Sequence, residues 1–142
     1  MHPFASSLKH QYKRKELLFE NKKYLPDFHL ETYRPVQVVS NKDNRFETWW
    51  DALHFMEAEI EAIGFDIALL GCGAFGHPLC SHIKKMGRKA VYMGGDLQMM
   101  FGIYGTRWEG HPLLNSNWIR PLEDDLPVGN TSGAYKALKN YV

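Results

Sequence analysis

Residues 65–76 read Phe-Asp-Ile-Ala-Leu-Leu-Gly-Cys-Gly-Ala-Phe-Gly, and this stretch decides the fold that we expect for the chain. Its apolar first half predicts a buried strand, and its second half forms a GxGxxG loop. A strand that enters a glycine-rich turn and a helix start brings backbone N–H groups to a phosphate, where the helix dipole favours negative charge. The stretch therefore predicts an α/β fold that binds a nucleotide. A turn shaped by packing alone is the alternative interpretation.

The three glycines of this loop have different expected roles. We expect Gly71 to make a tight turn, Gly73 to let a ligand approach without a side chain in the way, and Gly76 to permit close packing of helix against strand. His77 follows directly and is interpreted as part of the phosphate loop or as its cap. The predicted nucleotide-binding loop consists of Gly71, Cys72, Gly73, Ala74, Phe75, Gly76 and His77.

The residues after the loop predict a helix and a second strand. Pro78 suits a first helical turn, and Leu79 and Ile83 share one face, so a short amphipathic helix is expected over 77–86. Residues 89–93 then predict a strand. Together with the first strand they make a right-handed, parallel strand–helix–strand unit.

Gly94, Gly95 and Asp96 come at the expected carboxyl end of the second strand, the edge where open α/β sheets bind ligands. Asp96 lies 20 residues after Gly76, close to the spacing of the ribose-binding carboxylate in dinucleotide-binding proteins. An aspartate before an apolar helical run also accepts backbone N–H bonds as an N-cap. Ligand contact and helix capping therefore both stay open for Asp96.

The remaining elements are predicted from hydrophobic spacing and turn formers. From Pro112 onward the chain is expected to be an irregular cover, with a final helix from Ser132. In the loop after the second strand, Arg107 is the best candidate for contact with an anion. Further elements are expected as helices over 6–21, 47–62 and 96–103, and as a strand over 36–39.

Composition limits the function classes. The net charge of +1 removes the main argument for a nucleic-acid-binding protein, although 13–15 and 22–23 make the amino end locally basic. Cys72 and Cys80 are too few for a disulfide scaffold or a zinc ribbon. No stretch reaches the length of a membrane span and no signal-peptide core is visible, so a cytoplasmic protein without an integral membrane segment is expected.

Several motifs in order resemble one family. Gly71 to Gly76 is followed by a Gly-Gly-x-x-Gln element that ends at Gln98, then by Phe-Gly-Ile and Gly-x-Arg-Trp elements that end at Ile103 and Trp108. The series, together with Trp49 and a Trp-x-Arg-Pro segment that ends at Pro121, resembles the small GT-D-type glycosyltransferase-like domain of bacterial surface-polysaccharide gene clusters. The resemblance covers roughly residues 45–125. It implies a Rossmann-like fold and a nucleotide-sugar donor, with Mg²⁺ or Mn²⁺ as the candidate metal cofactor.

The sequence does not identify the ligands of such a metal. Established transferases of this kind carry an acidic Asp-x-Glu element, and its position in this chain is not apparent. Glu57-Ala58-Glu59 falls in a different helix, and Glu123-Asp124-Asp125 is interpreted first as a solvated acidic turn and second as a metal-binding cluster.

Together these features predict one three-layer α/β domain with a short, largely parallel sheet. Residues 1–44 are expected to form an N-terminal helix and connector, 45–110 the nucleotide-binding core, and 111–142 the cover. The expected activity is transfer of a sugar from a nucleotide sugar to a glycan acceptor, in a homo-oligomer or a larger assembly. The Gly71–Gly76 loop would hold the diphosphate, with Gly94 and Gly95 beside it.

Two side-chain roles complete this expectation. Asp96 or Gln98 would contact ribose or sugar hydroxyls, and Arg107 would stabilise the leaving diphosphate. An NAD(P)-dependent oxidoreductase and a non-catalytic nucleotide-binding module are the alternative functions.

Overall fold

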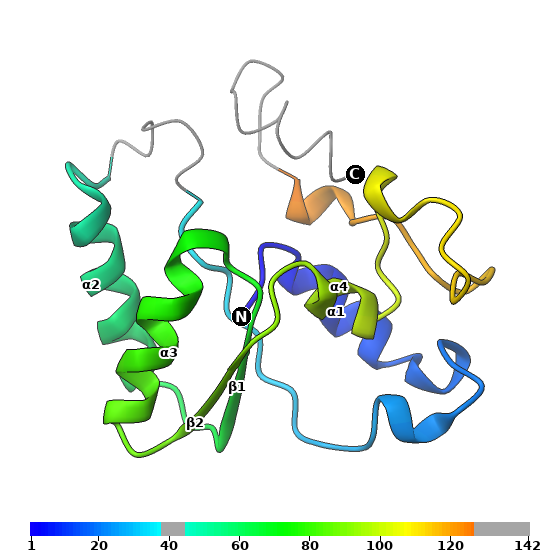
Figure 1. Ribbon diagram of the computed structural model, residues 1–142, viewed down its shortest axis with the longest axis horizontal. Helices are drawn as coiled ribbons and strands as arrows, with labels where there is room; N and C mark the ends of the chain where they lie inside the picture. Colours follow the sequence, from blue (N-terminus) through cyan, green and yellow to red (C-terminus); the bar gives the residue numbers. More distant parts are fainter. Residues whose placement is uncertain (38–44, 127–142) are drawn as a thin grey trace.

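The sheet consists of two parallel strands in the part of the chain that the computed structural model describes, residues 1–37 and 45–126. Strand β1 (Ile67–Leu70) pairs with β2 (Lys89–Tyr92), with Ile67 opposite Lys89 and Leu70 opposite Tyr92. Helix α3 (Gly76–Lys85) connects the strands, as Figure 1 shows. The predicted strand–loop–helix–strand unit and the α/β character of the fold are therefore confirmed. The prediction that the first strand is buried is wrong, because only Leu70 of β1 is buried and Ile67 is 53% exposed.

Helices α2 (Trp49–Glu61) and α3 lie together on one side of the sheet (Figure 1). Helix α2 starts at a capping box, in which Thr48 and Asp51 bond each other's backbone N–H groups. Its inward stripe packs with α3 and with the end of β1 in a core of buried apolar side chains: Val36, Ala52, Leu53, Met56, Ile60, Leu70, Cys72, Phe75, Leu79 and Ile83. The predictions that α2 and α3 each bury one face are confirmed.

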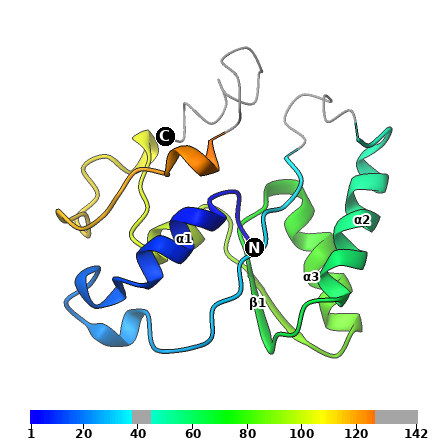
Figure 2. The same cartoon turned by 180° about the vertical axis from the view of Figure 1, so that it is seen from behind.

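Helices α1 (Ala5–Tyr12) and α4 (Asp96–Met100) lie on the other side of the strands, as the reverse view in Figure 2 shows for α1. A second core joins them to the turns after α1 and to partly buried Leu69 of β1. Its buried members are Phe4, Leu8, Leu18, Leu25, Leu97, Phe101 and Ile103. Helices thus flank both faces of a two-stranded sheet.

The helix predicted over 6–21 is shorter than expected. It ends at Tyr12, and short 3₁₀ turns follow at Lys15–Leu17 and Lys22–Tyr24. Leu18 lies fully buried beyond the end of the helix, and its carbonyl accepts a hydrogen bond from the indole N–H of Trp118 at 3.1 Å. Tertiary contacts of Leu18 therefore override the local helical pattern.

Two other predicted elements also differ from the structure. The helix predicted over 96–103 ends at Met100, because Gly102 takes a φ of +63° and Ile103 forms a parallel bridge with Ile119. In the strand predicted over 36–39, Val36 and Gln37 are not in a strand, and residues 38 and 39 lie outside the described residues. The final helix predicted from Ser132 also lies outside them.

The first two residues lie beside β1. The Met1 amine donates to the carbonyl of Leu69 at 2.8 Å, and the backbone N–H of Gly71 donates to the carbonyl of Met1 at 2.9 Å. His2 is buried, and its Nδ1 accepts a hydrogen bond from the backbone N–H of Phe4. Burial lowers the pKa of His2 to about 3, so this imidazole is neutral in the folded protein.

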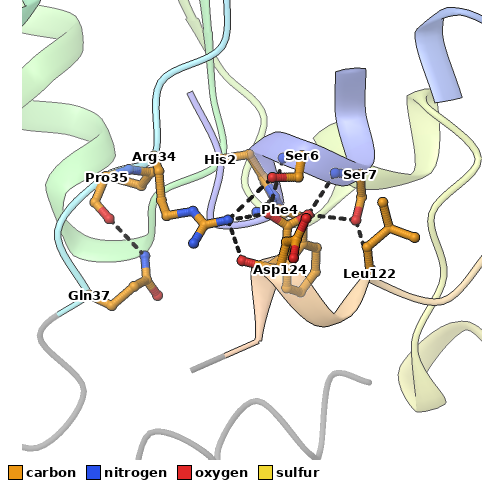
Figure 3. Close-up of polar contacts among 10 residues, drawn as sticks. His2, Phe4, Ser6, Ser7, Arg34, Pro35, Gln37, Leu122 and Asp124 are labelled. Atoms are coloured by element: carbon orange, nitrogen blue, oxygen red, sulfur yellow. Dashed lines mark hydrogen bonds and ion pairs between the residues drawn. The ribbon is translucent and has the colours of Figure 1, made fainter. Parts of the chain in front are cut away.

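Residues 112–126 are irregular, as expected, with one 3₁₀ turn at Glu123–Asp125. This turn packs on the start of α1, and Figure 3 shows Ser6, Ser7 and Arg34 gathered there. Asp125 is buried in that cluster, so the interpretation of this residue as part of a solvated turn is wrong. Among the described helices, none is both long and apolar enough to cross a membrane.

Candidate functional site

The two strand ends meet at Gly71. A Cβ placed on Gly71 would lie 2.5 Å from the carbonyl oxygen of Gly94 and 2.6 Å from the ring of His2. The chain after β2 also remains bonded to β1, since the N–H of Met93 donates to the carbonyl of Leu70 at 2.8 Å. Gly71 is thus required where the loop after β1 crosses the loop after β2, and it brings the predicted Gly94–Gly95 element next to the glycine loop.

Gly73 and Gly76 meet different surroundings. Gly73 has a φ of +55°, and a Cβ there would have no described atom within 4 Å. At Gly76 a Cβ would lie 2.1 Å from the ring of Tyr92, the last residue of β2. The hydroxyl of Tyr92 also donates to the carbonyl of Gly73 at 3.3 Å. Gly76 therefore permits close packing of helix against strand, as expected, while Gly73 leaves open space.

The side chains of the loop divide into two groups. Cys72 and Phe75 are buried, and the Phe75 ring stacks on Trp49 with 4.8 Å between ring centroids. Burial raises the pKa of Cys72 to about 11, so its thiol stays protonated near neutral pH. Gly73, Ala74 and His77 are exposed. What this loop offers a ligand is the backbone of Gly73 and Ala74, together with the His77 imidazole, which packs against Tyr92.

A hollow of about 390 Å³ lies beyond the carboxyl end of β2, between α4 and the loop that follows it. Asp96 and Arg107, which the sequence suggested separately, both line it. The other lining residues are Met99, Trp108, Glu109, Gly110 and His111. We call this the Asp96–Arg107 hollow.

Asp96 is the first residue of α4, and the N-cap position belongs to Gly95. Because Gly95 has no side chain, α4 has no side-chain cap bond, and the interpretation of Asp96 as the N-cap lacks support, although a carboxylate in the first turn suits the helix dipole. The Asp96 carboxylate has no hydrogen-bond or ion-pair partner among the described residues. It is therefore available at the surface of the hollow.

Gln98 does not lie where contact with ribose or sugar hydroxyls at this hollow would require it. Its side chain is buried, with 4% of the residue exposed, and its amide lies 3.4 Å from the carbonyl of Ile103, to which it donates. Gln98 does not line the Asp96–Arg107 hollow. Its position in the second core fits a role in holding the turn after α4.

Arg107 and Trp108 form the wall opposite α4. The Arg107 guanidinium lies 4.6 Å from the centre of the Trp108 ring. The Trp108 ring in turn lies against Gly95, where a Cβ would come within 3.2 Å of it. The absence of a side chain at Gly95 therefore allows Trp108 to pack against the start of α4. The Arg107 guanidinium, which lies over the Trp108 ring, is thereby positioned at the hollow.

A tight turn continues this wall. Glu109 has φ −58° and ψ 131°, Gly110 has φ +79°, and the N–H of His111 donates to the carbonyl of Trp108 at 3.1 Å. These values define a type II turn, in which the third residue needs a positive φ. Glu109 forms an ion pair with Arg120. The turn places His111 at the same hollow as Arg107.

The glycine loop and the hollow are neighbours without being one cavity. Both lie at the carboxyl edge of the sheet, and they meet through Gly71 and the Gly94–Gly95 element. None of the residues from Gly71 to His77 lines the hollow. The predicted site residues therefore fall into an exposed loop and an adjoining hollow that holds Asp96 and Arg107.

Of the acidic candidates for a metal site, Asp125, Glu59 and Glu57 have other partners, while Glu123 and Asp124 are exposed. Asp125 accepts hydrogen bonds from the start of α1, Glu59 accepts one from the hydroxyl of Tyr33, and Glu57 pairs with His54 and His82. The described residues contain no group of three His, Cys, Asp or Glu side chains arranged around an ion. Mg²⁺ commonly uses one or two carboxylates with phosphate oxygens, so Asp96 is the side chain that would share such an ion with a bound diphosphate.

A second hollow, of about 310 Å³, lies between the connector at Tyr33–Gln37 and helix α2. It contains no predicted site residue. The Tyr33 hydroxyl donates to Glu59 at 2.6 Å, and burial together with this bond raises the pKa of Tyr33. This contact joins the connector to α2, so Tyr33 and Glu59 both have a structural role.

Sequence reasoning did not single out Tyr92, Trp108 or His111 for the site. The sequence signal that could have identified His111 is the Glu109-Gly110 pair directly before it, which is typical of a turn. The structure shows this turn, in which Gly110 has a positive φ. Comparisons of the chain with protein-family models, with curated proteins and with solved structures returned no match. The glycosyltransferase resemblance therefore rests on the sequence motifs alone.

Proposed function

We propose that this protein is a nucleotide-sugar-dependent glycosyltransferase, or the donor-binding domain of one, built on a three-layer Rossmann-like fold and acting in polysaccharide biosynthesis. One observation carries the proposal: Asp96 and Arg107 line one hollow at the carboxyl end of a parallel strand. This is the edge at which open α/β sheets bind nucleotides. The Arg107 guanidinium suits the diphosphate of a nucleotide sugar, and the free Asp96 carboxylate suits the hydroxyl groups of its sugar.

Each group has a chemical task in this proposal. Arg107 donates paired hydrogen bonds to the diphosphate and stabilises the negative charge that develops as this group leaves. Asp96 accepts hydrogen bonds from sugar or ribose hydroxyls. Backbone N–H groups near Gly73 approach a phosphate where a side chain would block it. A divalent cation shared by Asp96 and the diphosphate would supply further neutralisation of charge.

The reaction joins the acceptor hydroxyl oxygen to the anomeric carbon, releases the hydroxyl proton to the solvent, and breaks the bond from that carbon to the diphosphate. The nucleoside diphosphate leaves with the bonding electrons. Arg107 lowers the barrier only if it binds the departing diphosphate more tightly than the intact donor, because interactions that strengthen in the transition state are the ones that accelerate a reaction.

The test is a thermal-shift panel of UDP-, GDP- and CDP-sugars, NAD and NADP, each with and without Mn²⁺. A ligand that binds only the folded state raises the melting temperature as its concentration exceeds its Kd. We expect a saturable rise with at least one nucleotide sugar and none with millimolar NAD or NADP. The ligand that binds is then incubated with acceptor glycans, and release of nucleoside diphosphate is measured.

The outcomes separate the three function classes. A saturable response to NAD without a response to nucleotide sugars would support an oxidoreductase and contradict the proposal. Binding of a nucleotide sugar without transfer or hydrolysis, by the full-length protein and with a broad panel of acceptors, would instead support a non-catalytic binding module. Free nucleosides serve as controls, since they lack the diphosphate that Arg107 is proposed to bind.

A further inference from the structure

His111 lines the same hollow as Asp96 and Arg107, and its ring has a defined hydrogen bond. The backbone N–H of Leu113 donates to Nδ1 of His111 at 3.3 Å. Only an Nδ1 without a proton accepts such a bond, so the neutral imidazole carries its proton on Nε2. The opposite nitrogen is therefore a hydrogen-bond donor.

This donor is held in place and left without a protein partner. The type II turn from Trp108 to His111 and the bond from Leu113 set the position of the ring. No described residue accepts a hydrogen bond from Nε2 of His111. A preorganised donor at the wall of a hollow contributes to binding because little side-chain freedom is lost when a ligand arrives.

The charges around the hollow suggest what this donor meets. Glu109 is the acid closest in sequence to His111, and its carboxylate pairs with Arg120. Arg107 and His111 are then two side chains of the hollow that can donate hydrogen bonds to an anion, while Asp96 is a free acceptor. Two donors beside one acceptor match a phosphate that bears a polyhydroxylated group.

From this arrangement we infer that His111 binds the diphosphate of the ligand through its Nε2–H, as a second donor beside Arg107. The inference rests on the proposed function and adds a specificity residue to it. His111 acts as a donor and not as the general base, because its Nδ1 lone pair is used by Leu113. It therefore distinguishes diphosphate ligands from the free nucleoside.

Two substitutions of His111 test its Nε2–H donor while the conformation of the turn is preserved. His111→Asn keeps an acceptor near the position of Nδ1, which preserves the bond from Leu113, and removes the donor at Nε2. His111→Gln places an amide N–H near the position of Nε2. An exposed histidine in α1, His10, provides the matched control His10→Asn. Circular dichroism and melting temperature are compared first, and all variants are expected to stay folded.

Affinity is then measured by titration calorimetry with UDP, GDP and CDP and with the corresponding nucleosides. For the diphosphate that the parent protein binds, we expect His111→Asn to weaken binding about tenfold or more, the usual range for a hydrogen bond to a charged group. His111→Gln should recover much of this loss. Nucleoside affinity and the His10→Asn variant should match the parent.

The result that overturns the inference is parent-like diphosphate binding by a folded His111→Asn variant, or an equal loss for nucleoside and diphosphate. In either case a specific loss of diphosphate binding by Arg107→Ala would still support the proposed function. If the parent protein binds none of the three diphosphates and none of the nucleotide sugars, the proposed function fails and the role of His111 fails with it.

Discussion

The carboxylate of Asp125 caps the helix that contains Ser7, 118 residues earlier in the chain. It accepts hydrogen bonds from the backbone N–H and the hydroxyl of Ser7, each at 2.6 Å, and from the N–H of Ser6 at 3.0 Å. Helix α1 has no cap bond from its own N-cap residue, Phe4. The Asp125 carboxylate therefore satisfies N–H groups in the first turn of α1 and meets the positive end of its dipole.

The first prediction concerns the stability that this cluster provides. The Asp125 side chain is fully buried and pairs with the guanidinium of Arg34, so Asp125→Ala leaves buried donors unsatisfied. We expect a loss of about 3 kcal/mol in the free energy of unfolding, measured by urea denaturation. Asp124→Ala is the matched control, since the Asp124 side chain is exposed. Equal stability of both variants would contradict the capping role.

The second prediction concerns pH. Because burial holds the folded-state pKa of His2 near 3, the unfolded chain binds a proton below about pH 6.5 that the folded protein does not. The stability that His2 contributes is complete above that pH and is lost as the pH falls toward 3. Between pH 7.5 and pH 5 the loss is about 2 kcal/mol.

His2→Asn tests this pH dependence. Asparagine keeps an acceptor for the backbone N–H of Phe4 and does not titrate. The free energy of unfolding is measured by urea denaturation at both pH values. We expect the variant to lose about 2 kcal/mol less than the parent over this interval. Identical pH dependence of the two proteins would show that His2 is protonated, or accessible, in the folded state.

The third prediction separates the two roles of Gly73. Its φ of +55° strains any residue with a Cβ, so Gly73→Ala should cost about 1 kcal/mol of stability although the space around it is open. If the loop holds a phosphate, nucleoside diphosphate affinity should fall as well. Gly87 has a φ of +77° and equally open surroundings, at the other end of α3.

Gly87→Ala is therefore the matched control for Gly73→Ala. We expect similar losses of melting temperature in both variants, with weakened binding only in Gly73→Ala. Parent-like affinity of Gly73→Ala would remove the loop from the binding site and leave the packing interpretation of the glycines.

The fourth prediction tests Asp96. Because Gly95 occupies the N-cap position, Asp96→Asn should leave the melting temperature nearly unchanged. A carboxylate that accepts hydroxyl groups should instead contribute about 1 to 2 kcal/mol to donor binding. Calorimetry with the nucleotide sugar identified in the thermal-shift panel measures this difference. Unchanged affinity would assign Asp96 to the helix dipole alone.

The fifth prediction concerns Arg107. Lysine keeps the charge and loses the paired donors of the guanidinium, so Arg107→Lys should weaken UDP binding, and Arg107→Ala should weaken it further, about tenfold or more. Uridine affinity should not change. If both variants bind UDP like the parent, the contact of Arg107 with Trp108 is a surface contact without a role in binding.

The core unit could be predicted from the sequence because its signals are local. An apolar run, three spaced glycines and a 3.6-residue period are read within about 30 residues, and the structure confirms β1, α3 and β2 in parallel order. The helix over 6–21 was wrong because its end depends on Leu18, whose partners are Asn115 and Trp118. Contacts across about a hundred residues have no local signature.

The candidate site shows the same division. Asp96 and Arg107 were proposed from residue type and position, and the sequence by itself determined the parallel unit at whose edge they lie. Only the tertiary structure decided that they line one hollow with His111, that Gln98 faces the core, and that Asp125 caps α1. Periodicity and turn chemistry act through neighbouring residues, whereas the burial and pairing of a polar side chain depend on which distant segments pack against it.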